Sequence, residues 1–283
     1  MYPFIEIFTL KIPTYALAFS AAFIICMIIM YRSAPKLGLR SDDTLYASIY
    51  GILGLVVFAK LFFFFTKASK LPLYIRFLKA GNSFSITQFC NYFFGGMVFY
   101  GGLIGYVTGV FIYSRIYKSP FMRYFDKYVP FMPLVHAFGR VGCFLAGCCY
   151  GIEYYGPFAV KFPYNELVPE LSEVSRFPVQ LLEAFINILC FLLLLFLRNT
   201  KKLKAGQLPG IYILFYLIER TLLEFLRGDA ARGSIGVLST SQFISILLIP
   251  VAFILVSGKL SSRLDCLNKS TDNSYSENPD CSH

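Results

Sequence analysis

Charged and nucleophilic side chains gather in one short stretch in the middle of this chain. His136, Arg140 and Cys143 are spaced by four and three residues, so they share one face if the stretch is a helix. Cys148 and Cys149 follow closely, with glycines between and around them. The residues on either side are strongly apolar. A guanidinium in hydrocarbon costs several kcal/mol, so it normally faces a polar cavity and marks a substrate path.

The composition predicts an all-α polytopic integral membrane protein. Hydrophobic residues make up 57% of the chain and charged residues 15%, and the mean hydropathy is +0.62. These values are too apolar for an ordinary soluble domain. About 20 apolar residues are needed for a helix to cross a bilayer. Seven such runs are found, at 13–31, 45–65, 95–117, 127–150, 178–197, 208–226 and 236–257.

The distribution of lysine and arginine predicts an N-terminus outside the cell and a cytoplasmic C-terminus. With this orientation, the connections in the cytoplasm carry the larger share of the positive residues. The connection at 66–94, with four positive residues, argues the other way. Residues 1–257 are expected to form the membrane domain of a multi-pass protein. Residues 258–283 are polar and are expected to form a disordered cytoplasmic tail.

The net charge of +10 fits this topology and an attraction to anionic lipid headgroups. Nucleic acid is not an expected partner, because no soluble domain carries a basic patch. The charges inside the predicted spans sum to zero, which favours internal pairing around one shared cavity. They are Lys60, Arg140, Glu183, Glu219, Arg220 and Glu224.

Two further segments suggest functional faces. Tyr216, Arg220, Glu224 and Arg227 are spaced by four, four and three residues and share one helical face. Five glycines surround Tyr100 at 95–105, where they would let a bulky ligand approach the backbone. Close packing of helices through small residues explains such glycines equally well.

The cysteines next to Arg140 raise the question of a metal or redox site. The sequence has no second CxxC or HxxxH partner, so a closed zinc site with four ligands would have to recruit His136. A vicinal redox pair of Cys148 and Cys149 is the other alternative. The simplest interpretation is that these are small buried thiols, so no metal and no cofactor is predicted.

With these motifs in view, the chain resembles the bacterial prolipoprotein diacylglyceryl transferases. The resemblance covers nearly the whole chain up to the tail. It rests on the segment around Tyr15 and on the motifs at 95–105, 139–147, 176–183 and 216–227. Members of that family are described as enzymes with seven helices and an outer N-terminus, as predicted above.

The resemblance implies an enzyme that transfers diacylglycerol from phosphatidylglycerol to a cysteine thiol of a lipobox-containing preprolipoprotein, releasing glycerol phosphate. It implies that Arg140 and Arg220 clamp the headgroup phosphate and that Glu224 orients Arg220. Tyr15 and Tyr216 would contact the donor or the acceptor. Further residues are assigned to substrate binding, namely Lys60, Gly101, Gly102, Cys143 and Gly147.

The chain departs from the family pattern at positions that bear on catalysis. The family usually has histidine at Tyr100, asparagine at Cys143, glutamate at Cys148 and arginine at Lys60. A phenol has an ordinary pKa of about 10 and is a weak base at neutral pH. His136, one turn before Arg140, is therefore the predicted proton acceptor, and Tyr100 is expected to donate a hydrogen bond.

These departures leave three functions open. The first is the transferase itself, with phosphatidylglycerol or another anionic phospholipid as the donor. The second is a divergent paralogue that modifies another acceptor. The third is a membrane protein that binds or transports lipid without catalysis, having kept the phosphate clamp and lost the base.

Overall fold

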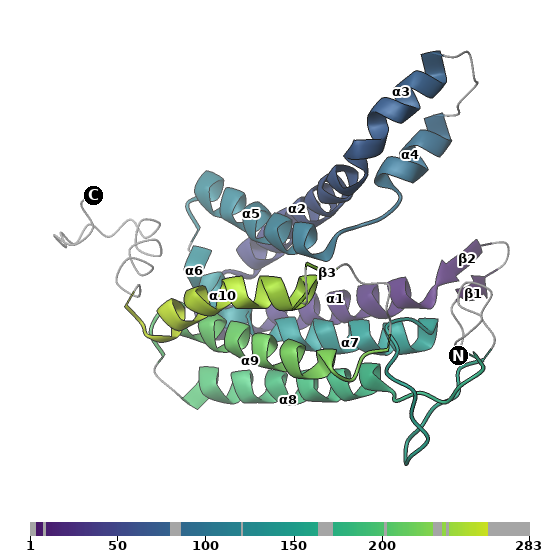
Figure 1. The fold of residues 1–283 in the computed structure, drawn as a ribbon. Helices are drawn as coiled ribbons and strands as arrows, with labels where there is room; N and C mark the ends of the chain where they lie inside the picture. The colour runs from purple at the N-terminus through teal and green to yellow at the C-terminus, as the bar shows by residue number, and fades with distance from the viewer. Residues whose placement is uncertain are drawn as a thin grey trace. The chain divides into compact units, whose positions relative to one another are not determined.

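A computed structural model describes residues 4–7, 10–79, 86–119, 121–163, 172–200, 203–228, 234–235 and 238–259 of the 283-residue chain. Most of these residues are helical (Figure 1). The chain divides into two compact units. One unit is residues 31–121, and the other joins the chain up to Met30 to most of the chain from Met122 onward. The predicted tail lies outside the described residues from position 260 onward.

The unit of residues 31–121 is built on a pair of helices that pack through glycines. These helices are α2 (Ser41–Lys67) and α5 (Phe99–Tyr117). A Cβ added to Gly54 would collide with the carbonyl oxygen of Gly105, and a Cβ added to Gly105 would collide with that of Gly54. Gly109 meets another backbone carbonyl of α2 in the same way. Such contacts let two backbones approach closely, as is common in membrane proteins.

Shorter helices complete this unit. They are the 3₁₀ turns η1 (Pro35–Leu37) and η2 (Ala68–Lys70) and the helices α3 (Leu71–Lys79) and α4 (Ile86–Phe94). The chain leaves α2 through η2 and α3 and returns as α4. Aromatic rings hold α4 in place: Phe64 stacks on Phe94 with centroids 5.3 Å apart, and Tyr74 packs on Tyr92 at 5.0 Å.

In the larger unit, the described residues form five longer helices and two small strand pairs. The helices are α1 (Thr14–Ser33), α7 (Phe131–Ala146), α8 (Val179–Thr200), α9 (Gln207–Glu224) and α10 (Thr240–Val256), with the short α6 (Phe121–Tyr128) before α7. The strands pair antiparallel, β1 (Phe4–Ile7) with β2 (Leu10–Pro13) and β3 (Ser234–Ile235) with β4 (Leu238–Ser239). The described chain is therefore mostly, but not entirely, α-helical.

Helices α8, α9 and α10 run side by side in chain order (Figure 1), and α7 lies beside α8. Helix α8 packs on both α7 and α9, and α9 also packs on α10. Near the end of α10, Gln207 donates a hydrogen bond to the Val256 carbonyl at 2.9 Å. This row of helices supplies nearly every charged residue of the site described below.

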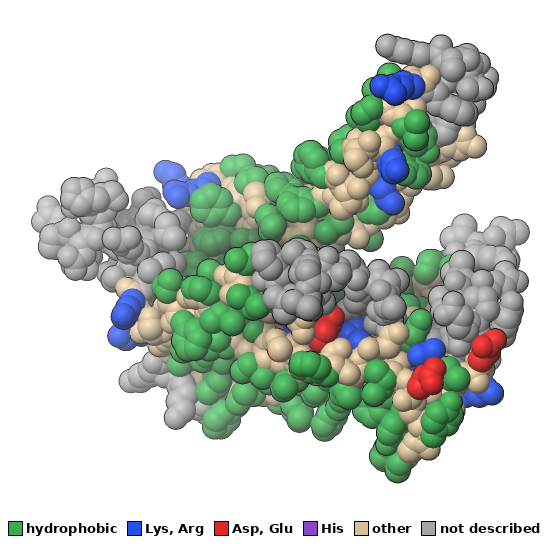
Figure 2. All heavy atoms as spheres, in the orientation of Figure 1, with side chains coloured by type: hydrophobic (Ala, Val, Ile, Leu, Met, Phe, Trp, Pro, Cys, Tyr) green, Lys and Arg blue, Asp and Glu red, His purple; other side chains and the backbone are tan. Residues whose placement is uncertain are grey.

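The surface of α8 is inverted relative to that of a soluble helix. Phe185 is 57% exposed and Phe196 is 58% exposed, whereas Gln180, Glu183 and Asn187 are at most 1% exposed. Figure 2 shows hydrophobic side chains over most of the described helical surface on the face that it draws. Soluble proteins rarely expose apolar patches of this extent. This arrangement supports a lipid environment around the helices.

A helix is found in each of the seven segments predicted to span a membrane. Three stretches of the described chain are long and apolar enough by themselves, namely Thr14–Ser33, Ser41–Arg76 and Val179–Asn199. The fourth predicted span is not continuous, because α6 and α7 meet at an angle of 55°. Counting that bent pair as one span gives four.

The bend between α6 and α7 has a simple physical cause. Pro130 occupies the N-cap of α7, and Pro133 lies in its first turn. Proline has no backbone N–H and clashes with the preceding turn, so a helix usually ends before it and a new one starts there.

Candidate functional site

Two faces of helix α7 make different contacts. His136, Arg140 and Cys143 lie on one face, as their spacing predicts. The other face packs against α1: a Cβ added to Gly142 would lie 3.2 Å from Ala18 Cβ and 3.2 Å from Tyr15 Cα. The glycine therefore allows α1 to approach α7 at this level.

Helix α8 supplies a buried polar stripe opposite α7. Gln180, Glu183 and Asn187 are separated by three and four residues, so they fall on one face of the helix. The Asn187 Nδ2 group donates hydrogen bonds to the Glu183 carbonyl at 2.9 Å and to Glu219 Oε1 of α9 at 2.6 Å. The stripe thus links α8 to α9 through polar contacts inside the unit.

Glu183 is the centre of the charge cluster. Its Oε1 lies 2.9 Å from Arg140 Nη2 and 3.5 Å from His136 Nε2, and its Oε2 lies 3.8 Å from Arg227 Nη1. The side chain of Glu183 is only 2% exposed, whereas those of Arg140 and His136 are 15% and 17% exposed. A carboxylate buried this deeply needs opposite charges beside it, and two arginines supply them.

The contact between Arg140 and His136 bears on the predicted base. Arg140 Nε donates a hydrogen bond to His136 Nε2 at 3.1 Å. Because Nε2 accepts this bond, its lone pair is engaged and the neutral tautomer carries its hydrogen on Nδ1. For His136 to accept a thiol proton at Nε2, the bond from Arg140 must first break. The role of His136 as proton acceptor stays a prediction.

Helix α9 contributes a second ion pair. Arg220 Nη2 lies 2.9 Å from Glu224 Oε2, one turn later on the same helix. Tyr216, one turn before Arg220, places its ring 5.8 Å from the His136 ring, which connects α9 to α7. The residues predicted on α7 and α9 therefore belong to one polar cluster between α7, α8 and α9. Its apolar surroundings strengthen every charge interaction within it.

Several buried acceptor atoms in this cluster have no hydrogen-bond partner among the described residues. They are Gln180 Oε1, Glu183 Oε2, Asn187 Oδ1 and Glu219 Oε2. Buried polar atoms are nearly always paired in proteins. The cluster therefore offers guanidinium donors that suit an anion, together with acceptors that suit hydroxyl groups.

The other predicted substrate-binding residue on a helix of this unit is Tyr15. It lies in the first turn of α1, beside Gly142, and its side chain is half-exposed. Its ring stacks on that of Phe19 with centroids 6.2 Å apart. Its contact with a substrate stays a prediction.

The remaining predicted residues lie in the unit of residues 31–121. Lys60 Nζ donates a hydrogen bond to the Phe94 carbonyl at 2.7 Å, at the C-terminal end of α4. Gly101 faces α2, where an added Cβ would lie 2.7 Å from the Phe58 carbonyl oxygen. Gly102 meets α2 side chains at 3.3 Å or more. Packing of α5 on α2 thus explains these glycines, and their role in substrate binding stays a prediction.

Tyr100, the second residue of α5, is half-buried. It belongs to a different unit from His136, Arg140 and Arg220, so the catalytic set predicted from the sequence is divided between the two units.

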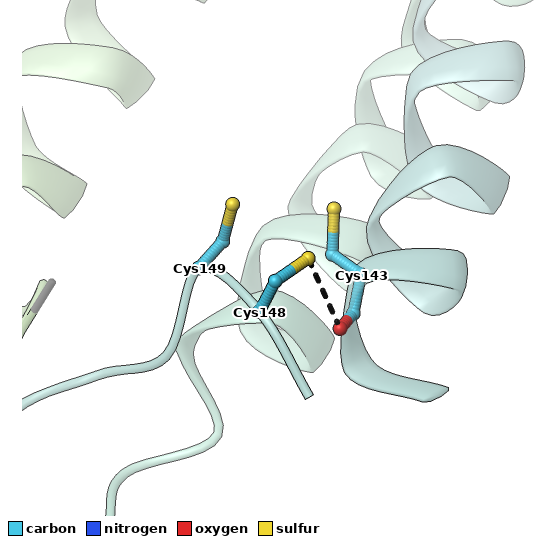
Figure 3. Close-up of side chains that lie close together, drawn as sticks. All are labelled: Cys143, Cys148 and Cys149. Atoms are coloured by element: carbon cyan, nitrogen blue, oxygen red, sulfur yellow. Dashed lines mark hydrogen bonds between the residues drawn. The ribbon is translucent and has the colours of Figure 1, made fainter. Parts of the chain in front are cut away.

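Three cysteines lie together where α7 ends. Cys143 is buried, Cys148 is exposed and Cys149 is half-buried, and their three sulfur atoms lie within 4.8 Å of one another (Figure 3). Gly147, another predicted binding residue, forms the left-handed cap of α7 with φ of 71°. Its observed role is thus to turn the chain back toward Cys143.

Five residues of the cluster were not among the predicted site residues: Gln180, Glu183, Asn187, Glu219 and Arg227. Glu183 and Glu219 had been predicted only as paired charges of one shared cavity, and Arg227 only as part of a helical face with Tyr216. The sequence also contained a signal for Gln180 and Asn187. Polar residues at 180, 183 and 187 repeat with helical spacing inside a run of leucine, isoleucine and phenylalanine. A stripe of this kind in a membrane helix must face other protein groups.

Comparison with known proteins identifies the family of this chain. A family model described as prolipoprotein diacylglyceryl transferase matches residues 3–257. The phosphatidylglycerol–prolipoprotein diacylglyceryl transferase of Clostridium tetani (strain Massachusetts / E88) is 32% identical over 246 residues, which cover 86% of this chain and 92% of that relative. The phosphatidylglycerol–prolipoprotein diacylglyceryl transferase 2 of Clostridium perfringens (strain 13 / Type A) is 33% identical over 255 residues, with 90% and 91% covered. The chain belongs to the prolipoprotein diacylglyceryl transferase family, as its sequence motifs predict.

Proposed function

We propose that this protein transfers a diacylglyceryl group from phosphatidylglycerol to a cysteine thiol of a prolipoprotein. The observation that carries the proposal is the buried cluster in which Arg140 of α7 and Arg220 of α9, in an apolar unit, each pair with a carboxylate. Family membership supports the reaction type, and the cluster supplies groups that suit its substrate.

The reaction needs stabilisation of a leaving phosphate. The acceptor sulfur forms a bond to the terminal glyceryl carbon of diacylglycerol, and the bond from that carbon to the phosphate oxygen breaks. The electron pair leaves with the oxygen, so glycerol phosphate departs with one more negative charge than the phosphate of the intact lipid. Guanidinium groups that point at this oxygen stabilise the developing charge. Arg140 and Arg220 are assigned this role.

The unpartnered acceptors support a glycerol headgroup. Phosphatidylglycerol carries two hydroxyl groups beyond its phosphate, and hydroxyls donate hydrogen bonds to carboxylate and amide oxygens. Asn187 Oδ1 and Glu219 Oε2 are buried acceptors of this kind on α8 and α9. A headgroup with its phosphate on the arginines and its hydroxyls on these oxygens would satisfy both sets of atoms.

The membrane topology is part of the same proposal. We assign seven spans to residues 1–257, with the N-terminus outside and residues 258–283 as a cytoplasmic tail, in the bacterial cell membrane. The larger share of positive residues in the cytoplasmic connections supports this orientation. The exposed apolar faces of the helices support the spans.

A reconstituted transfer reaction tests the function. The purified protein is incubated with labelled phosphatidylglycerol and a lipobox peptide, and the peptide is examined for a thioether-linked diacylglyceryl group. We expect lipidated peptide and an equal amount of glycerol phosphate, with no product from a peptide that has serine in place of the cysteine. Binding of the lipid with no transfer would instead favour a non-catalytic lipid-binding protein. Transfer to other thiols but not to the lipobox peptide would favour a divergent acceptor.

A further inference from the structure

The three cysteines at the end of α7 form a compact set of thiols. The sulfur atoms of Cys143, Cys148 and Cys149 lie within 4.8 Å of one another, and all three thiols are free of disulfides. Figure 3 shows Cys148 and Cys149 on the loop beside Cys143, with the Cys148 sulfur directed at the Cys143 carbonyl oxygen, to which it donates a hydrogen bond at 3.7 Å. This set was not expected from the helical spacing of the sequence, because two of the residues follow the helix rather than belong to it.

The local backbone explains how the sulfurs meet. Gly147 donates to the Phe144 carbonyl at 3.2 Å, and the Cys148 N–H donates to the Cys143 carbonyl at 3.0 Å. These two bonds are the Schellman motif, which brings the residue after the left-handed cap next to the last turn of the helix. Cys149 then adopts a left-handed φ of 58°, which is uncommon for a residue other than glycine.

Contacts on both sides hold this turn in place. The buried Gln180 of α8 donates a hydrogen bond to the Cys148 carbonyl at 2.8 Å. Directly after Cys149, the Tyr150 carbonyl accepts a hydrogen bond from the Gly228 N–H at 3.0 Å, and the Ile152 N–H donates to the Leu226 carbonyl at 3.1 Å. The thiols are therefore presented by a backbone that is fixed before any ligand binds, which is what an efficient ligand set requires.

We propose that Cys143, Cys148 and Cys149 bind one Zn²⁺ ion as three thiolates, and that the acceptor cysteine of the prolipoprotein provides the fourth ligand. This second part rests on the function proposed above. Thiolates are preferred ligands of Zn²⁺, and sites with three protein ligands leave a position for substrate. With Zn–S bonds of about 2.3 Å in tetrahedral geometry, sulfurs lie about 3.8 Å apart. The three sulfurs lie within 4.8 Å of one another, so the longest sulfur–sulfur distance must shorten by at most about 1 Å to reach this geometry.

The exposure of the three residues gives the site an entrance. Cys143 is buried and Cys148 is exposed, so an incoming thiol can reach the metal from the side of Cys148. Arg140 lies three residues before Cys143 on the same helical face, next to the cluster that is assigned to the phosphate. The acceptor sulfur and the lipid headgroup would then meet at the end of α7.

The metal supplies a way for the acceptor thiol to lose its proton. His136 Nε2 already accepts a hydrogen bond from Arg140, whereas a thiol that coordinates Zn²⁺ is deprotonated on binding. The released proton goes to solvent. The bound sulfur forms its bond to the glyceryl carbon as the carbon–oxygen bond breaks, and the electron pair leaves with the phosphate. The thioether product is a neutral, weaker ligand and dissociates from the metal.

The first experiment measures the metal alone. The reduced protein in detergent is titrated with Co²⁺, which reports thiolate ligands through a charge-transfer absorption, and then with Zn²⁺. We expect one Co²⁺ per chain, displaced by Zn²⁺, and at least a tenfold loss of affinity in Cys148→Ser and in Cys149→Ser. Cys90→Ser, which removes an exposed thiol of α4, is the matched control and should bind as the original chain does.

Two results would overturn the metal site. One is the absence of the thiolate absorption in a protein whose thiol titration shows all three cysteines reduced. The other is Co²⁺ binding by Cys148→Ser and Cys149→Ser that is as strong as binding by the original chain. Because Cys148 is exposed, its replacement by serine leaves the packing of α7 intact, and thermal unfolding of each variant checks that the chain is folded.

The second experiment tests the acceptor as fourth ligand. A lipobox peptide is added to the Co²⁺-loaded protein, and we expect the ligand-field absorption of the metal to change with the cysteine peptide and not with its serine counterpart. An unchanged spectrum would overturn the acceptor role. A protein that passes both tests but gives no lipidated peptide contradicts the proposed function and not the metal site. A protein that transfers lipid without binding the metal contradicts the metal site alone.

Discussion

Arg140 and His136, one turn apart on α7, share a hydrogen bond in which Arg140 Nε donates to His136 Nε2 at 3.1 Å. The same guanidinium reaches Glu183 through Nη2 at 2.9 Å. A neutral acceptor and a carboxylate, 3.5 Å apart, thus both hold Arg140 along its Nε/Nη2 edge. Its remaining donors are directed by these two contacts, which is the preorganisation that a phosphate site needs.

This relationship predicts that His136 acts mainly by positioning Arg140. His136→Gln keeps a hydrogen-bond acceptor without a titratable group, so we expect it to retain most of the transfer rate with an unchanged pH profile. His136→Leu removes the acceptor and should lower the rate at least about tenfold, since hydrogen bonds to charged groups contribute roughly 1.5–3 kcal/mol. Initial rates across a pH series check both variants. Equal losses in both, with the steepest loss at acidic pH for His136→Gln, would establish His136 as the base.

Replacement of either clamp arginine by lysine should impair catalysis without unfolding the protein. Lysine keeps the charge and loses the planar fork that binds phosphate through two hydrogen bonds. We expect Arg140→Lys and Arg220→Lys each to lower turnover about 10- to 100-fold. Arg115→Lys is the control, because Arg115 is exposed in the other unit and stacks over Phe111 at 5.0 Å. Turnover equal to that of the original chain in both clamp variants would make these arginines structural ion-pair partners.

Glu183 is expected to control stability more than any exposed carboxylate does. It is 2% exposed and faces Arg140 and Arg227, so Glu183→Leu leaves two arginines without their shared partner. Breaking a buried pair in this way costs about 3–5 kcal/mol. Thermal unfolding in detergent should show a large decrease for Glu183→Leu. Glu153→Gln, which alters an exposed carboxylate, should show almost none, and similar values for both would contradict the central role of Glu183.

Two glycines of α7 form a matched pair for testing its packing on α1. Replacement of a helical glycine by alanine stabilises a helix by about 0.5–1 kcal/mol. An added Cβ at Gly139 meets its nearest atom, on Phe19, at 3.7 Å, whereas at Gly142 it meets Ala18 and Tyr15 at 3.2 Å. We therefore expect Gly139→Ala to be neutral or stabilising and Gly142→Ala to be less stable by about 1–2 kcal/mol. The same unfolding temperature in both variants would show that α1 is not packed closely at Gly142.

The orientation in the membrane is testable by cysteine labelling. In a chain whose native cysteines are changed to serine, Ser172→Cys should react with an impermeant reagent in intact cells. Lys259→Cys should react only after permeabilisation. The reverse pattern would invert the proposed topology and place the end of α7 on the cytoplasmic side.

Hydropathy predicted where the longer helices of the described chain lie, because each apolar run in the sequence overlaps one of them, but it did not predict the short helices α3, α4 and α6. It did not predict the 55° bend between α6 and α7, since Pro130 and Pro133 interrupt the backbone without reducing the apolar character of the run. Helical spacing also placed His136 and Arg140 on one face of α7, where they share a hydrogen bond.

Other parts of the site depend on contacts that spacing does not report. The convergence of Cys148 with Cys143 depends on the turn at Gly147, where the chain leaves the helical period. From the sequence alone, Gly101 and Gly102 could face either a ligand or a neighbouring helix. The structure shows that they face α2. Glu183 was recognised from the sequence as a buried charge. Its pairing with Arg140 could be identified only from the way α7 and α8 pack together.

The inverted surface of α8 also sets the order in which this protein can assemble. The helix is apolar enough to enter a bilayer alone, yet in isolation Gln180, Glu183 and Asn187 would face lipid, where polar side chains are unfavourable. They gain their partners only when α7 and α9 are in place beside them. A chain that stops after α8 therefore lacks α9, and Asn187 has no Glu219 to which it can donate its hydrogen bond. Asn187 therefore gains its contact with Glu219 only once α9 has been made and packed on α8.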